Sequence, residues 1–165
     1  MNKSFKYILI ATASAGALTT AGLLLFRKKY SAVTIKGRIS SKFGLRTDPV
    51  TKKPSSQHNG IDIGLPTGTP IFAPTKGTVV EVYNELDSTR GRGIGCKINH
   101  GEIDTVYYHM SKIYVTKGQK INAGDKIGLI GSTGKSTGSH LHFGVFNNKL
   151  AIWLDPQKTK YFRMA

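Results

Sequence analysis

After Lys36 the sequence consists of short apolar alternations separated by glycine and proline, and it shows little of the periodicity that a helix needs. Alternation of apolar and polar side chains between turn-forming residues is typical of β-strands. We therefore expect an all-β fold, a compact antiparallel β-sheet or sandwich. The expected strands are Pro70–Phe72, Gly77–Tyr83, Gly95–Asn99, Thr105–Tyr108, Lys126–Ile130 and Leu141–Phe146.

Three longer connections interrupt this pattern, at Arg46–Gln57, Asn84–Gly95 and Ser132–Ser139. Each loop precedes or links a strand that carries a candidate site residue. Loops on a rigid sheet are the usual place for ligand contacts. We expect these long loops to wall a groove.

The N-terminal segment has a different composition. Tyr7–Phe26 is uncharged and lies between lysines and the three cations Arg27–Lys29. At about 1.5 Å per residue it spans about 30 Å, the thickness of a bilayer core. Its ending in Leu-Leu-Leu-Phe favours an uncleaved transmembrane helix, with a cleaved signal peptide as the alternative. The expected units are an anchor at 1–30, a tether at 31–36, a folded domain at 37–156 and a C-terminal tail at 157–165.

The chain is strongly basic, with 24 Lys and Arg against nine Asp and Glu and a formal net charge of +15. Residues after position 30 keep 19 of those cations, so the folded part is basic in its own right. Basic surfaces attract anionic lipids, anionic envelope polymers or nucleic acid. No nucleic-acid motif is present, so we expect no nucleic-acid partner. Cys96 is the one cysteine, which excludes an intrachain disulfide.

Four of the five histidines lie in three short segments whose spacing fits a zinc ion. His58 and Asp62 stand four apart, His140 and His142 stand two apart, and His109 lies between these segments. A catalytic zinc site uses three protein ligands, usually imidazoles and carboxylates, and leaves one position for water. His58, Asp62 and one histidine of the second pair would form such a set. Two histidines then remain for proton transfer.

Strand geometry supports this grouping, because residues two apart in a strand share a face. His140 and His142 should therefore face the same groove. The same reasoning places Tyr107 and His109 on one face, where Tyr107 is either an additional donor in the groove or a packing residue. Asp62 lies between two isoleucines, and a carboxylate buried there would be costly without a metal or histidine partner. Arg46 either binds a substrate carboxylate or forms a structural ion pair.

Six motifs in a fixed order carry a family resemblance across about residues 36–156. Taken together they closely resemble the lysostaphin/LytM-type peptidoglycan metalloendopeptidases. The motifs are FGLR, HNGIDIG, the AP-x-x-G-x-V turn, YYHM, the stretch Lys117–Gly128 and GSTGKSTGSHLHF.

The resemblance implies a metallopeptidase domain that holds one Zn²⁺ per chain and cuts peptide stems or cross-bridges of bacterial peptidoglycan. It implies that His58, Asp62 and His142 hold the zinc, and that His109 and His140 are the active-site histidines. It leaves open which of these two is the base and which peptide bond is cut.

Some members of this family have lost ligands and only activate other wall hydrolases, so a non-catalytic wall-binding protein or activator is the alternative. This chain keeps every ligand, and its departures from the family pattern, Met110 and Ser139, do not involve the ligands. The expected location is a single-pass membrane protein with its catalytic domain outside the cytoplasm. The membrane of a bacterial virion is a second possibility, and cleavage of the N-terminal segment would make the protein secreted.

Overall fold

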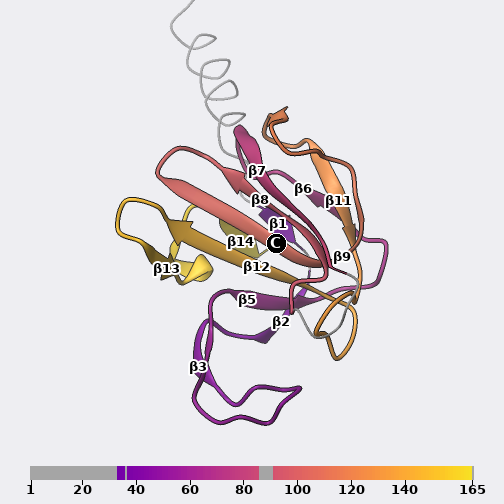
Figure 1. The fold of residues 1–165 in the computed structure, drawn as a ribbon, viewed down its shortest axis with the longest axis vertical. Coiled ribbons are helices and arrows are strands. Elements are labelled where there is room, and N and C mark those ends of the chain that lie inside the picture. The colour runs from indigo at the N-terminus through magenta and orange to yellow at the C-terminus, as the bar shows by residue number, and fades with distance from the viewer. Residues whose placement is uncertain (1–32, 36, 86–90, 165) are drawn as a thin grey trace, which may run out of the picture.

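The computed structural model describes residues 33–35, 37–85 and 91–164, and within them the chain is almost entirely β-structure (Figure 1). Its one helical element among these residues is the short 3₁₀ helix η2 (Pro156–Lys158). The strands are β1 (Val33–Ile35), β2 (Arg38–Ser41), β3 (Gly44–Arg46), β4 (Ser56–His58), β5 (Ile61–Gly64), β6 (Pro70–Phe72), β7 (Gly77–Asn84), β8 (Ile94–Asn99), β9 (Ile103–Ile113), β10 (Lys120–Ile121), β11 (Lys126–Ile130), β12 (His140–Asn147), β13 (Ile152–Leu154) and β14 (Phe162–Met164).

Most strands join one antiparallel sheet in the order β10-β7-β8-β9-β12-β5-β2. In addition, β11 pairs with both β6 and β9, and β13 pairs with β12. The expected all-β antiparallel fold is therefore confirmed. The six expected strands match observed ones closely, except that β9 continues to Ile113. Its added length lets β9 pair with β8, β12 and β11.

Strand β12 shows how the sequence alternation separates the core from the polar face. Leu141, Phe143 and Val145 are fully buried in the core, while His140 and His142 project to the opposite face. Burying each of these apolar side chains contributes about 1.5–3 kcal/mol. The core therefore fixes which way the two histidines face.

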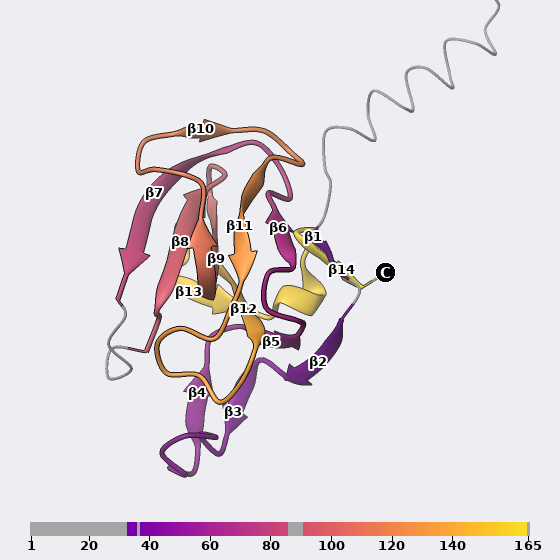
Figure 2. The same cartoon turned by 90° about the vertical axis from the view of Figure 1, so that its right-hand side faces the viewer.

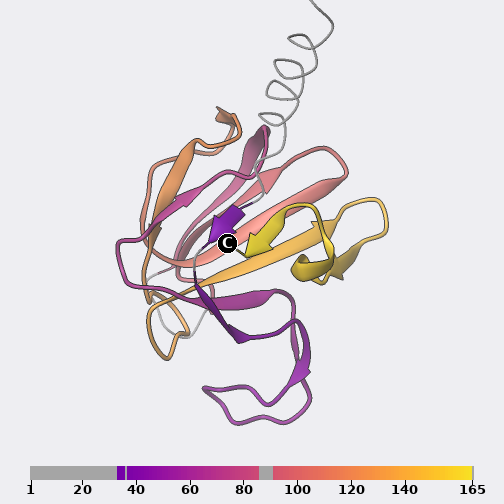
Figure 3. The same cartoon turned by 180° about the vertical axis from the view of Figure 1, so that it is seen from behind.

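The two ends of the described chain pair with each other. Strands β1 and β14 form a parallel two-stranded sheet and lie side by side in Figure 3. Tyr161 and Phe162 are buried, and the Phe162 ring lies 6.0 Å from the Phe143 ring, centroid to centroid. Within the expected tail, Tyr161 and Phe162 thus pack onto the core, and strand β1 of the expected tether pairs with β14.

The site-bearing segments gather at one end of the sheet. Figure 2 shows the β3–β4 hairpin and the loop between β11 and β12 at this end, with β10 at the opposite end. The described residues contain no helix of sufficient length and apolar character to cross a membrane. The anchor expected at residues 1–30 lies outside the described residues.

Candidate metal centre

Three donor atoms from three strands converge on one buried point. The His58 Nε2 atom, at the end of β4, lies 3.1 Å from Asp62 Oδ1 and 3.1 Å from His142 Nδ1. The His142 Nδ1 atom lies 3.0 Å from the same Asp62 oxygen. All three residues are buried, and their donor atoms lie within 4.8 Å of one another. The structure therefore brings together the three residues that the sequence analysis expected to hold zinc.

Sheet register explains this convergence. Asp62 in β5 stands directly opposite His142 in β12, and the β3–β4 hairpin adds His58 from the side. Gly60 permits the close approach, because a Cβ atom there would lie 2.5 Å from the Phe143 carbonyl oxygen and 2.8 Å from His142 Nε2. A side chain at position 60 would push β12 and its ligand away.

The hydrogen bonding of His58 prepares it to bind a metal. Its Nδ1 atom lies 2.7 Å from the Lys42 carbonyl oxygen, which can only accept, so Nδ1 carries the proton. In the neutral ring, Nε2 then presents a lone pair to Asp62 and His142. Such a backbone contact is typical of metal-binding histidines, since it fixes the tautomer and the ring orientation. Two imidazole nitrogens and one carboxylate oxygen packed this closely fit Zn²⁺ well.

Asp62 is held in its ionised form. Burial opposes its ionisation, but its contacts with the His142 and His58 imidazoles outweigh burial and hold the pKa of the Asp62 carboxyl well below its usual range. Its second oxygen, Oδ2, lies 3.2 Å from Arg46 Nη1, which also donates to Ser41 Oγ at 2.6 Å. Of the two expectations for Arg46, the structure shows the ion pair.

His109 and His140 form a second pair beside the donors, with ring centroids 4.6 Å apart. Their Nδ1 atoms donate to main-chain carbonyl oxygens, His109 to Thr133 and His140 to Gly138, each at 2.8 Å. The Nε2 atom of each neutral ring is then available to accept a proton. His140 Nε2 lies 3.8 Å from Asp62 Oδ1. Burial lowers the pKa of His109 to about 4, so this ring is neutral near pH 7.

Of the two roles expected for Tyr107, the structure shows packing, and Tyr107 does not share a face with His109. Tyr107 has 0% of its surface exposed and packs in the core against Phe143. The reason is a β-bulge: Cys96 pairs with Tyr107 and Ile94 with Met110, so one residue of β8 faces two residues of β9.

The bulge places two consecutive side chains on the site face. His109 has a φ of 63°, in the left-handed region that non-glycine residues rarely adopt. Its neighbour Tyr108 stacks on the His142 ring, with centroids 5.1 Å apart and planes 10° from parallel. Tyr108, rather than Tyr107, is thus the tyrosine that supports the centre. Simple alternation along β9 could not reveal this.

Thr133 holds the bulge in place. Its hydroxyl donates to the Met110 carbonyl at 2.7 Å and accepts from the Ile94 N–H at 2.9 Å. Its own carbonyl accepts the hydrogen bond from His109 Nδ1. Gly93 makes room for this contact, since a Cβ atom there would lie 2.5 Å from the Thr133 carbonyl oxygen. One threonine therefore both bridges β8 to β9 and orients the His109 ring.

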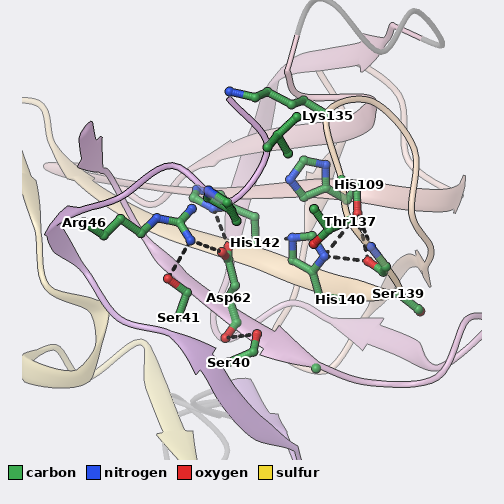
Figure 4. A pocket seen from close by; sticks show the side chains of 15 residues that line it. Ser40, Ser41, Arg46, Asp62, His109, Lys135, Thr137, Ser139, His140 and His142 are labelled. Atoms are coloured by element: carbon green, nitrogen blue, oxygen red, sulfur yellow. Dashed lines mark hydrogen bonds and ion pairs between the residues drawn. The ribbon is translucent and has the colours of Figure 1, made fainter. Parts of the chain in front are cut away.

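A groove of about 320 Å³ opens over the centre. Figure 4 shows Arg46 on one side of Asp62, and His140 and His109 on the other. Of the three loops expected to wall the groove, Arg46–Gln57 and Ser132–Ser139 do so, whereas no described residue of Asn84–Gly95 lines it. Several hydroxyl groups line it, from Ser40, Ser41, Ser136, Thr137 and Ser139.

An ion pair joins the two walls of this groove. Lys135 Nζ lies 2.7 Å from Asp48 Oδ2, although the two residues are 87 positions apart in the sequence. The other oxygen of Asp48 accepts from the backbone N–H groups of Val50 and Thr51. Lys135 and these turn contacts lower the pKa of Asp48 well below its usual range. No sequence signal pointed to this pair, because nothing local indicates that the two loops meet.

Comparison with known proteins gives independent evidence of the family to which the chain is related. The model of peptidase family M23 matches residues 56–154. The peptidoglycan DD-endopeptidase ShyA of Vibrio cholerae is 45% identical over 113 residues, which cover 67% of this chain and 25% of that protein. The chain thus spans about a quarter of the length of this curated relative.

Two solved structures share the fold. A zinc-containing peptidase from Vibrio cholerae superposes with a TM-score of 0.67 at 34% identity, covering 81% of this chain and 40% of the other. The catalytic domain of lysostaphin from Staphylococcus simulans gives a TM-score of 0.63 at 30% identity, covering 73% of this chain and 90% of the other.

Proposed function

The chain belongs to peptidase family M23, and on this basis we propose that it is a zinc-dependent endopeptidase that hydrolyses peptide stems or cross-bridges of bacterial peptidoglycan. The family match confirms the resemblance drawn from the sequence motifs. One observation carries the proposal: the donors of His58, Asp62 and His142 converge beneath a groove that also holds two histidines with available Nε2 atoms. One Vibrio cholerae relative is named a peptidoglycan DD-endopeptidase, and the two solved structures are named as peptidases, one of them zinc-containing. These names support a zinc-dependent peptidase.

His58, Asp62 and His142 would hold the zinc ion. Zinc in such a site supplies Lewis acidity, polarising a peptide carbonyl and lowering the pKa of water. The protein contributes a buried carboxylate that stays ionised and a His58 ring whose tautomer is fixed by the Lys42 carbonyl. Arg46 and Tyr108 support this arrangement from outside, Arg46 on the Asp62 carboxylate and Tyr108 on the His142 ring.

His109 and His140 would move protons. Each ring uses its Nδ1–H on a main-chain carbonyl, so its Nε2 can accept a proton from a water that attacks the substrate carbonyl. Once protonated, the same nitrogen can donate to the developing oxyanion or to the leaving amine. The low pKa of His109 keeps the base form available at neutral pH. The hydroxyl groups that line the groove would bind the peptide backbone of the substrate.

The proposed substrate indicates where the protein should be located. Peptidoglycan lies outside the cytoplasmic membrane, so we propose that the apolar run Tyr7–Phe26 anchors the chain in a membrane with the catalytic domain on the wall side. The same arrangement would serve a bacterial virus whose membrane carries the enzyme. Cleavage of the N-terminal segment would instead release a secreted enzyme.

The proposal is tested with zinc-loaded full-length protein and purified sacculi of several cross-bridge types. Newly exposed amino groups are measured with and without a chelator, and mass spectrometry identifies the fragments. We expect chelator-sensitive release. Asp62→Ala should lose both zinc and release, whereas His140→Ala should keep zinc and lose release. Stoichiometric zinc without release from any sacculus would contradict the proposal and support a non-catalytic wall-binding protein.

A further inference from the structure

Lys135 places a fixed cation in the wall of the catalytic groove. It lines the groove from the loop between β11 and β12, and its side chain is 30% exposed. Its Nζ atom donates to Asp48 Oδ2 at 2.7 Å. In Figure 4 the side chain extends from its own loop toward the loop between β3 and β4, which contains Asp48. The ammonium group is therefore held at a defined position, although lysine side chains are usually mobile.

Asp48 holds this cation without occupying the groove. It is not among the described residues that line the groove. Its Oδ1 atom accepts from the N–H groups of Val50 and Thr51 at 2.9 and 2.8 Å, so its own turn fixes the carboxylate. A lysine ammonium has three N–H donors, and one of them points to Asp48. The described residues give Lys135 Nζ no second hydrogen bond, so two donors remain for a ligand.

The other charges in the described lining of the groove are paired with each other. Arg46 and Lys135 are its cations and Asp62 is its acid. Arg46 Nη1 lies 3.2 Å from Asp62 Oδ2, and the other oxygen of Asp62 contacts His58 and His142. Lys135 is thus the lining cation whose partner lies outside the groove. Because a concave surface with excess positive charge concentrates anions, the groove favours a substrate with negative charge near the cleaved bond.

We propose that Lys135 binds a carboxylate of the peptide that the groove cleaves. At neutral pH the negative charges of a peptide are carboxylates, and a charge-assisted hydrogen bond to one is about twice as strong as a neutral bond. The inference rests on the proposed function and selects between the substrate classes given there. A peptide stem with a free carboxylate provides a partner for Lys135, whereas an oligoglycine cross-bridge consists of uncharged amides.

The size of the groove limits where this carboxylate can lie. About 320 Å³ contains both the candidate metal ligands Asp62 and His142 and the Lys135 side chain, so the groove has room for only a short peptide segment. The carboxylate therefore belongs to a residue within a few positions of the cleaved bond. Two neighbours complete the subsite: Val50, 44% exposed, offers an apolar surface for the aliphatic part of an acidic residue, and the exposed Thr137 adds a hydroxyl.

This subsite should discriminate against the neutral analogue of the same substrate. A carboxamide has the shape of a carboxylate but lacks the charge, so its contact with Lys135 loses the charge-assisted hydrogen bond. Since Asp48 already orders the lysine, little of the binding free energy is lost in fixing its rotamers. We expect a preference for the carboxylate of at least about tenfold in kcat/KM, expressed mainly in KM.

Matched synthetic substrates test the proposal. Cross-linked stem-peptide dimers are made with a carboxylate or a carboxamide at each free acid group in turn, and zinc-loaded full-length protein cleaves them at neutral pH. Amidation at one position should lower kcat/KM at least about tenfold, and in Lys135→Gln the same amidation should change it less than about twofold. Lys135→Arg keeps a cation and should retain most of the preference. Because each variant is compared with itself on two substrates, a general loss of activity cancels.

The control Lys149→Gln removes an exposed lysine outside the groove and should keep the parent preference. Equal kcat/KM for every acid and amide pair would overturn the inference about Lys135, and so would a Lys135→Gln protein that keeps the parent preference. Cleavage of an oligoglycine-bridged substrate alone would also overturn it, while the proposed peptidase function would stand. No cleavage of any of these substrates would contradict the proposed function, and the inference with it.

Discussion

Removing the Thr133 hydroxyl should destabilise the β-bulge beside the candidate metal centre. It changes none of the three residues that would hold the metal. In Thr133→Val the side chain keeps nearly the same shape but loses its hydrogen bonds to the Met110 carbonyl and the Ile94 N–H. Each bond contributes about 1 kcal/mol net, and an unsatisfied buried group costs about 1–3 kcal/mol. The loss of unfolding free energy should therefore be about 2–4 kcal/mol.

Urea unfolding measures this loss directly. With an m-value of about 2 kcal/mol/M, the unfolding midpoint of Thr133→Val should fall by about 1–2 M. The conservative control Thr133→Ser keeps the hydroxyl and should lie near the parent midpoint. Thr116→Val, at an exposed turn, controls for the general effect of the substitution.

The same variant tests the role of the bulge in catalysis. Because Thr133 also positions the His109 ring through its carbonyl, Thr133→Val should lower kcat while bound zinc stays stoichiometric. Thr133→Ser should recover most of the rate. A Thr133→Val protein with the parent midpoint and the parent kcat would refute the reasoning that this threonine holds the bulge.

Three further predictions concern the metal, pH and the groove. Zinc at about 1,000 times its Kd should stabilise metal-free protein by about 4 kcal/mol, seen as a rise in Tm that Asp62→Ala should lack. In metal-free protein the unfolding free energy should fall as pH drops from about 6.5 to about 4, because the unfolded state protonates His109 while burial holds its folded-state pKa at about 4. His109→Gln should remove up to about 3 kcal/mol of this fall in urea titrations, and an unchanged slope would contradict the assignment. Asp48→Asn and Lys135→Gln should each raise KM with little change in kcat, and the double variant should resemble either single one; additive effects would show that the two residues act separately.

The fold and the convergence of the candidate metal ligands were predictable because their signals are local. Alternation of the core residues in β12 separates Leu141 and Phe143 from His140 and His142, so the shared face of the two histidines could be read from spacing alone. The isoleucines around Asp62 likewise showed that its carboxylate would be buried. Identification of the complete donor set also needed the family resemblance.

The parts that were missed depend on contacts between distant segments. The bulge at Tyr108 and His109 arises where β9 meets β8 and Thr133, so alternation placed Tyr107 on the wrong face. The pairing of β1 with β14 joins strands that are individually too short to be recognised. The Asp48–Lys135 pair forms only because two loops meet across the groove.

The bulge also determines how this centre could be transplanted into another protein. Regular antiparallel strands present alternate side chains, so a designer who copied only the four histidines and Asp62 would turn either Tyr108 or His109 away from the metal. The host would need an inserted residue opposite Gly95 and a hydroxyl placed like that of Thr133. The transferable unit is thus a defect in the sheet together with the loop that supports it, rather than a list of ligands.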